Sequence, residues 1–301
     1  MNYGLMLPNL GTYGNPSTLV DLAVEAEAAG WDGFFVWDTF KHAESEGKPV
    51  ADAWLTLASI ATRTERIRIG PRVSAPPRHR PWLLAQQAVT LDHLSAGRLI
   101  LGVGSGEVDD RGFSAFGEEP DARRRAEMLD ESLEIMAGLW SGEPFAWSGQ
   151  HYRFEEFQLL PRPIQQPRIP VWVAGTWPRP RPMERATRWD GVNPFAMADD
   201  GSFPSLSAED IDGLRRFGER HHPAGAPWDI AIDGPVFAAQ QDDRARAQLR
   251  AMEEAGATWL VEAVSTETDL TELRAAIRVG PPIPGSSSQP AALSGAGRRG
   301  R

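Results

Sequence analysis

The stretch from residue 66 to 107, RIRIGPRVSAPPRHRPWLLAQQAVTLDHLSAGRLILGVGSGE, decides the fold of this chain. Apolar residues over 67–73 predict a short strand. Pro81 suits the first turn of a helix, apolar residues recur at helical spacing after it, and Gly97 suits its end. Residues 99–103 then predict a second buried strand. Because a helix connects the two strands, we expect them to be parallel.

The same alternation of strand and helix continues along the chain. The eight predicted strands are residues 2–7, 33–37, 67–73, 99–103, 171–174, 191–193, 229–233 and 258–264. Helices are predicted at 16–29, 52–63, 81–96, 121–140, 183–188, 206–221, 244–255 and 269–279. Residues 141–160 break the pattern and predict a hairpin insertion after the fourth barrel helix. Eight alternations favour a closed (β/α)8 TIM barrel of the α/β class over an open doubly wound sheet.

Length and composition predict one domain. The chain has 301 residues, of which 41% are hydrophobic, and a barrel of this type uses ~250 residues. We therefore expect a single barrel over residues 1–280. Residues 281–301 are mostly Gly, Pro, Ser, Ala and Arg, so we expect a disordered tail.

Several classes of function are disfavoured by the composition. The formal charge of −10 argues against nucleic-acid binding. No apolar run approaches the ~18 residues of a membrane span, and the N-terminus has no basic region typical of a signal peptide, so we expect a cytoplasmic protein. The sequence has no cysteine, and its six histidines do not form a zinc-binding pattern, so we expect no metal site.

The C-terminal ends of the strands are where such barrels carry their active site. Aromatic residues gather after the second predicted strand, at Trp37 and Phe40, with Trp54 nearby and Asn9 after the first strand. An apolar, aromatic opening with few charges suits a flat heterocyclic ligand. We therefore expect these four residues to line the substrate pocket.

Two carboxylates are the best candidates for acid–base chemistry. Asp38 and Glu107 both follow predicted strands among apolar residues, where desolvation would raise the pKa of a carboxyl group. The alternatives are that Asp38 caps a loop or helix and that Glu107 is an exposed loop charge.

Two glycine-containing segments are candidate ligand sites. Residues 102–106 read GVGSG, which lacks the spacing of a dinucleotide-binding loop, so they form either a tight turn or a surface that a flat ligand approaches. Residues 175–177 read GTW and precede a short helix carrying Arg179, Arg181 and Arg185. That arrangement either binds a phosphate or is a solvated basic turn. Neither a nucleophile elbow nor a P-loop is present.

With these residues in view, the chain resembles the bacterial luciferase-like monooxygenase superfamily. The resemblance rests on PWLLAQQAVTLDHLSAGRLILGVGSGE, on EAEAAGWDGFFVWD and on LPRPIQQPRIPVWVAGTWP followed by RWDGV, and it covers about residues 1–280. It implies a (β/α)8 barrel, often dimeric, that binds reduced FMN or the related deazaflavin coenzyme F420.

The resemblance also implies three groups of cofactor-binding residues. Val73 and Ser74 would lie beneath the isoalloxazine ring, where the family often has a non-prolyl cis peptide bond. The ring would be lined by Gly104, Ser105, Gly106 and Glu107, and the phosphate would be held by Gly175, Thr176 and Trp177. Asp38 matches an acidic residue beside the ring in deazaflavin members. Their sugar-phosphate dehydrogenases follow it with a histidine, but this chain has Thr39, which argues against their substrate and proton-transfer machinery.

Four functions are consistent with these features. The leading hypothesis is a flavin-dependent monooxygenase that uses reduced FMN and oxygen on a small organic substrate. We expect this enzyme to be a homodimer that receives its reduced FMN from a separate flavin reductase. The first alternative is a deazaflavin-dependent enzyme that transfers a hydride. A non-catalytic flavin-binding barrel and a metal-dependent hydrolase stay open as weaker alternatives.

Overall fold

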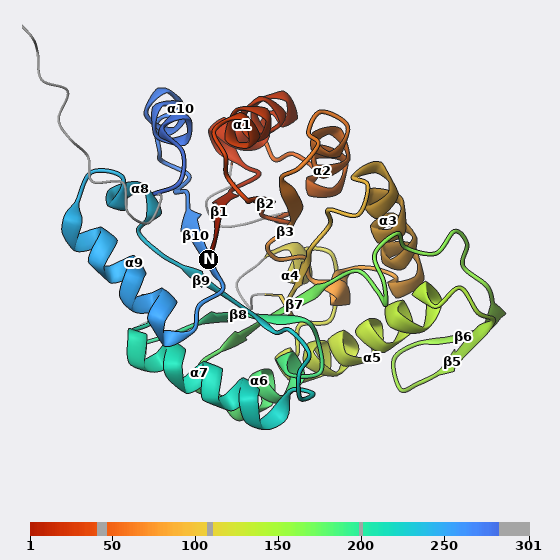
Figure 1. The fold of residues 1–301 in the computed structure, drawn as a ribbon. Coiled ribbons are helices and arrows are strands. Elements are labelled where there is room, and N and C mark those ends of the chain that lie inside the picture. The colour runs from red at the N-terminus through yellow and green to blue at the C-terminus, as the bar shows by residue number, and fades with distance from the viewer. Residues whose placement is uncertain (41–46, 107–110, 199–200, 283–301) are drawn as a thin grey trace, which may run out of the picture.

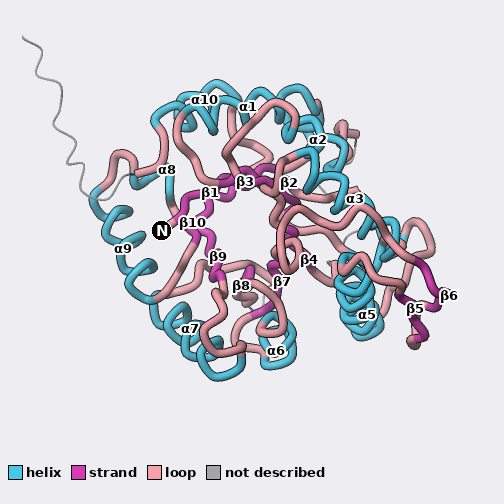
Figure 2. The backbone as a smooth tube through the Cα atoms, turned by 45° about the vertical axis from the view of Figure 1, so that its right-hand side comes forward, coloured by secondary structure: helices cyan, strands magenta, loops and turns pink. Residues whose placement is uncertain are grey.

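The computed structural model describes residues 1–40, 47–106, 111–198 and 201–282, and its strands form a parallel barrel surrounded by helices (Figure 1). The predicted fold class is therefore confirmed. The barrel strands, in the order in which they pair, are β3 (Arg68–Pro71), β2 (Gly33–Val36), β1 (Asn2–Leu7), β10 (Trp259–Ala263), β9 (Asp229–Asp233), β8 (Gly191–Phe195), β7 (Val171–Thr176) and β4 (Leu101–Val103). Figure 2 shows these strands as a ring with the helices outside it.

The seam between β3 and β4 closes the barrel. Parallel bridges join Ile69 to Leu99 and Ser74 to Val103. Gly70 makes this close approach possible, because a Cβ there would lie 1.8 Å from the carbonyl oxygen of Ile100. The close packing of the seam brings the segment after β3 against the end of β4.

Helices cover the outside of the barrel, and short polar side chains cap several of them. Asn15, Asp52, Asp121 and Asp269 each accept a hydrogen bond from a backbone N–H in the first turn of the helix that follows. The helices are α1 (Pro16–Ala28), α2 (Ala53–Ala61), α3 (Pro81–Leu94), α4 (Arg111–Ser114), α5 (Ala122–Trp140), α6 (Pro180–Ala186), α7 (Ala208–His221), α8 (Val236–Ala239), α9 (Asp243–Ala255) and α10 (Leu270–Val279).

Three aromatic rings fill the inside of the barrel. Phe35, Trp172 and Trp259 are buried there, and their ring centroids lie 5.2–5.9 Å apart. The barrel is thus a packed core and not a pore, as is usual for this architecture. A ligand must therefore bind at one end.

The predicted hairpin is confirmed, while some strand ends differ from the prediction. β5 (Phe145–Ser148) and β6 (Arg153–Phe157) pair in antiparallel fashion after α5, the fourth large helix, and stand away from the barrel (Figure 2). β7 extends to Thr176 because its last residues pair with the end of β8, so Gly175 and Thr176 belong to a strand and not to the loop after it. The tail predicted at 281–301 lies, except for its first two residues, outside the described part.

Candidate active site

The segment after β3 and the end of β4 form one edge of the barrel mouth. The peptide bond between Arg72 and Val73 is cis, as the resemblance implies. The backbone N–H of Ser74 donates to the carbonyl of Gly102, and the N–H of Gly104 donates to the carbonyl of Ser74, each at 2.9 Å. The predicted residues Val73, Ser74 and Gly104 are therefore brought side by side by backbone pairing.

A buried hydrogen-bond chain ends on Asp38. The hydroxyl of Ser74 is fully buried and donates to Oδ2 of Asp38 at 2.6 Å. The same hydroxyl accepts a hydrogen bond from the indole N–H of Trp54 at 3.2 Å. Trp54 therefore lies behind Ser74, where it fixes the hydroxyl toward Asp38, and it is only 8% exposed. Its predicted place in the substrate pocket stays a prediction.

The pKa of Asp38 is lowered, and the expectation of a raised pKa is therefore wrong. Burial alone would raise it, but the His79 ring, the Arg78 guanidinium and the Ser74 hydroxyl together favour the carboxylate. His79 Nε2 lies 3.6 Å from Asp38 Oδ2, and Arg78 Nη2 lies 3.8 Å from Oδ1. The structure shows the burial that the sequence predicts, but nothing in the sequence indicates that His79 and Arg78 lie beside this carboxylate. Asp38 is thus an ionised hydrogen-bond acceptor near neutral pH.

The glycines after β4 keep side chains away from the backbone at the mouth. A Cβ on Gly104 would lie 3.2 Å from Cγ2 of Val73. Gly106 has φ +83°, and a Cβ there would lie 2.4 Å from the ring of Phe113, which is buried. Ser105 between them is half-buried. Glu107 lies outside the described residues, so its predicted role is not examined by the structure.

The GTW segment is divided between the inside and the outside of the barrel. A Cβ on Gly175 would lie 2.6 Å from Cβ of Pro182, so this glycine lets α6 pack against β7. The Trp177 indole donates to Asp210 of α7 at 3.1 Å, which directs the ring outward. Thr176 is half-buried at the end of β7. These positions leave only backbone and the Thr176 side chain for the phosphate contact that the resemblance implies.

The three arginines beyond this segment have different surroundings. Arg185 pairs with Asp130 of α5, with Nε and Oδ1 2.7 Å apart, and so fastens α6 to α5. Arg179 and Arg181 are exposed. Arg185 is therefore committed to a structural ion pair, and only the other two fit the phosphate hypothesis.

The remaining predicted pocket residues separate into buried and exposed groups. The amide of Asn9 is fully buried and donates to the carbonyls of Thr39 and Ala51, so this side chain holds two loops together. Trp37 is half-buried. Phe40 is 61% exposed and packs edge-on against Phe116, with the ring centroids 5.1 Å apart. Of the four predicted pocket residues, Phe40 and Trp37 are thus the ones whose rings reach solvent.

Arg72 is a prominent residue of the mouth that sequence reasoning missed. Its side chain is 2% exposed, and Nη1 lies 2.6 Å from Oδ1 of Asp233 on β9. Nη2 donates to Oδ1 of Asn193 on β8 and, at 3.2 Å, to the carbonyl of Ala231. The guanidinium therefore crosses the barrel and places a positive charge below the mouth. The sequence does contain an indication of this role. Arg72 lies two positions after Gly70, and side chains two positions apart along a strand point to the same face, which here is the inside of the barrel.

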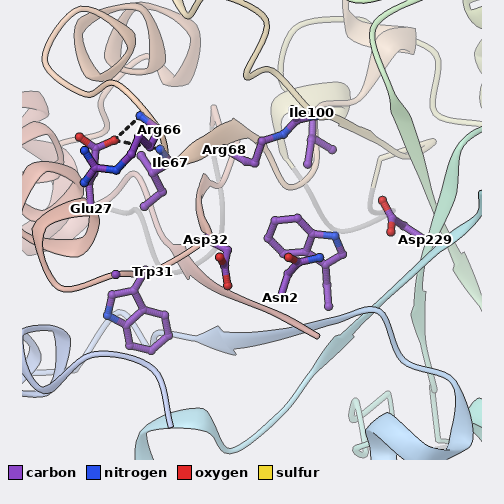
Figure 3. Close-up of a pocket in the computed structure, with 11 residues that line it drawn as sticks. Asn2, Glu27, Trp31, Asp32, Arg66, Ile67, Arg68, Ile100 and Asp229 are labelled. Atoms are coloured by element: carbon purple, nitrogen blue, oxygen red, sulfur yellow. Dashed lines mark hydrogen bonds between the residues drawn. The ribbon is translucent and has the colours of Figure 1, made fainter. Parts of the chain in front are cut away.

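A cavity of about 540 Å³ lies at the opposite end of the barrel. Figure 3 shows Asn2, Asp32, Arg68 and Asp229 around it, all at or before the N-terminal ends of strands. Glu27 accepts hydrogen bonds there from the backbone of residues 65–67. Because the N-terminal face of such a barrel serves stability, we assign these contacts to the fold and place the candidate site at the mouth.

The described residues contain neither a membrane-spanning helix nor a cluster of metal ligands. No helix in this part of the chain is long and apolar enough to cross a membrane. No group of three or more His, Asp or Glu side chains in the same ranges could hold a metal ion.

The fold is that of a (β/α)8 barrel, and the arrangement of residues at the strand ends places a candidate ligand site at its C-terminal mouth. The chain matches the luciferase-like monooxygenase family over residues 1–297, and it belongs to that family.

Curated relatives match part of the chain. An F420-dependent glucose-6-phosphate dehydrogenase of Amycolatopsis mediterranei is 37% identical over 166 residues, which is 54% of this chain and 49% of the relative. One of Microbacterium testaceum is 31% identical over 224 residues, which is 72% of this chain and 64% of the relative. The chain thus spans about half to two thirds of the length of these relatives.

Solved structures match the whole barrel at low identity. An F420-dependent secondary alcohol dehydrogenase in complex with an F420–acetone adduct has a TM-score of 0.70 and 18% identity, covering 92% of this chain and 96% of the other. The oxygenating constituent of a diketocamphane monooxygenase from Pseudomonas putida, in complex with FMN, has a TM-score of 0.72 and 18% identity, covering 93% and 96%. At this identity the likeness shows the shared fold.

Proposed function

We propose that this protein is an F420-dependent oxidoreductase that transfers a hydride between the deazaflavin and a small organic substrate. The observation that carries the proposal is the ionised carboxylate of Asp38, fixed by Ser74 directly beside the cis bond at Val73. The curated relatives named above are F420-dependent dehydrogenases, which supports the deazaflavin over FMN.

The residues at the mouth fit a flat ring. Gly104 has no side chain to fill the space beside Val73. The neighbours are also small, since Ala174 lies next to Gly104 and Ala75 lies next to Gly106. The deazaflavin would accept or donate a hydride when bound. Val73, Ser74 and the backbone of residues 104–106 would hold its ring, and the buried Arg72 would contribute a positive charge from below.

A monooxygenase that uses reduced FMN and oxygen is the second candidate. The exposed Phe40–Phe116 pair at the mouth favours it, because an apolar rim excludes water from a reactive flavin. It would need a flavin reductase as a partner, whereas the deazaflavin enzyme would not. A flavin-binding barrel without turnover is the remaining outcome.

Two parallel assays of the purified protein test this proposal. One contains oxidised F420 and an alcohol, and the other contains reduced FMN in air; the F420 absorbance and the oxygen uptake are measured. We expect loss of the visible absorbance of F420 with no oxygen uptake. Oxygen consumption with reduced FMN, together with unchanged F420, would establish the monooxygenase instead. Binding of either cofactor without turnover would indicate that the protein binds or stores the cofactor and is not an enzyme.

We also propose that the protein is a homodimer. Leu55 of α2 and Leu94 of α3 are 72% and 46% exposed and line one groove. Exposed leucines on adjacent helices are typical of a surface that a partner covers. Light scattering across a concentration series tests this, and Leu55→Glu should shift the mass to that of one chain.

A further inference from the structure

His79 lies at the mouth next to Asp38. It follows the short 3-10 turn η3 (Pro76–Arg78), in the connection between β3 and α3, on the same side of the barrel as the end of β2. Its Nε2 lies 3.6 Å from Asp38 Oδ2, and its side chain is 25% exposed compared with 14% for Asp38. The imidazole is therefore the more accessible member of the pair.

The loop that carries His79 encloses the Asp38 carboxylate. Ser74 donates to Oδ2 at 2.6 Å, and the Arg78 guanidinium lies 3.8 Å from Oδ1 and also donates to the Asp38 carbonyl. A carboxylate held in this way stays ionised and fixed in place. It is poorly suited to take up a proton, but it is well suited to orient an adjacent imidazole and to stabilise the imidazolium ion.

The other histidines of the described part lie away from the mouth. His93 of α3 donates from Nε2 to the carbonyl of Arg162, and His151 lies in the turn between β5 and β6, with Nε2 3.3 Å from Glu127 Oε2. His221 and His222 lie at the C-terminal end of α7. Within the described ranges, His79 is thus the histidine that faces the candidate site.

We propose that His79 is the proton-transfer residue of this enzyme and that Asp38 is its positioning residue. This inference rests on the proposed deazaflavin function and gives it a substrate class, an alcohol or its carbonyl product. Asp38 faces Nε2, so it holds the proton on that nitrogen and leaves Nδ1 as the acceptor. The 3.6 Å contact is long for a hydrogen bond, as such contacts often are before substrate binds.

The reaction balances as a two-electron oxidation of the alcohol. The C–H bond of the alcohol would break, and the bound deazaflavin would accept the hydride and so be reduced by two electrons. The O–H bond breaks, its proton passes to Nδ1 of His79, and the carbon–oxygen double bond forms. In the reverse direction His79 returns the proton to the carbonyl oxygen.

The test compares wild type, His79→Ala, His79→Gln and a matched control, His93→Gln, on the outer face of α3. Propan-2-ol and glucose-6-phosphate serve as probe alcohols, and loss of the visible absorbance of F420 gives kcat. We expect both His79 variants to lose about 100-fold or more in kcat, with F420 affinity changed less than about twofold. Imidazole added to the buffer should restore part of the His79→Ala rate, which a merely structural role would not allow.

A second readout does not depend on turnover. Nitrogen-15 NMR of the cofactor-free protein should show the His79 ring with its proton on Nε2 in wild type and a mixture of both tautomers in Asp38→Asn. Wild-type kcat in either His79 variant, or no imidazole rescue, would overturn the inference while the deazaflavin function stands. F420 binding without oxidation of either alcohol would also overturn it. Failure to bind F420 at all would overturn both proposals.

Discussion

Removing the Ser74 hydroxyl tests whether the buried hydrogen-bond chain holds Asp38 ionised. In Ser74→Ala, Asp38 Oδ2 loses a 2.6 Å hydrogen bond and the Trp54 indole loses its 3.2 Å acceptor. A hydrogen bond to a charged group contributes about 1.5–3 kcal/mol, and an orphaned buried donor costs about 1–3 kcal/mol. Because Asp38 keeps its two basic neighbours and Trp54 is not wholly buried, we take the lower part of each range. The expected loss of unfolding free energy is about 2.5–4 kcal/mol at pH 7.

The two parts of this loss respond differently to pH. The folded-state pKa of Asp38 lies below its ordinary value of 3.8, so its contribution to stability is present above that pH and disappears as the pH falls through the folded pKa. The deficit of Ser74→Ala should therefore narrow below about pH 4, leaving the part that comes from Trp54. The pKa of Asp38 should also rise in the variant, because a hydrogen bond that favours the carboxylate is gone.

Urea unfolding between pH 3 and 7 and carbon-13 NMR titration of the Asp38 carboxyl group measure these two effects. Ser95→Ala is the matched control, because Ser95 is also fully buried and makes two hydrogen bonds, but with backbone groups remote from Asp38. It should lose about 1–2 kcal/mol, with little pH dependence and no change in Asp38. A Ser74→Ala deficit that stays constant down to pH 3, with Asp38 titrating as in wild type, would refute the reasoning.

Two further substitutions examine the floor and the rim of the mouth. Arg72→Met should lower the unfolding free energy by about 2–4 kcal/mol in urea unfolding, because it leaves the polar partners of the guanidinium unpaired. Asp233 is 55% exposed, so water replaces part of its lost interaction. A loss below about 0.5 kcal/mol would contradict a structural role for the guanidinium. Gly106→Ala should cost about 2–4 kcal/mol in thermal unfolding, since it combines a positive φ with a 2.4 Å approach to the Phe113 ring. Gly117→Ala has a similar φ of +72° with no neighbour, so it should cost only about 1–2 kcal/mol, and equal losses in the two variants would show that the ring does not matter.

The fold could be predicted from the sequence because its signals are local and repeated. Each barrel strand is a short apolar run bounded by Gly or Pro, and each helix has an amphipathic or capped pattern, as at Asn15 and Pro16. Strand ends were less accurate, because pairing with a neighbour decides them. Thr176 belongs to β7 because it pairs with Phe195, and nothing near Thr176 in the sequence indicates this.

The sequence predicts where the candidate site lies and that its residues lie together, but it does not predict their electrostatics. The rule that barrels bind ligands at their strand ends found Asp38, Ser74 and Gly104 together. The lowered pKa of Asp38 comes from Arg78 and His79, about 40 positions further along the chain. Contacts between loops that follow different strands depend on loop conformation, which periodicity and spacing do not specify.

Equilibrium titration with oxidised F420, in the absence and presence of FMN, tests the central claim most directly. The mouth formed by Ser74, the cis bond at Val73 and the glycines of residues 104–106 should bind the deazaflavin saturably, and FMN should compete at least about tenfold more weakly, a difference of ~1.4 kcal/mol. Gly117→Ala should bind F420 as wild type does, while Gly106→Ala should bind it more weakly. Saturable binding of FMN with no binding of F420 would contradict the account.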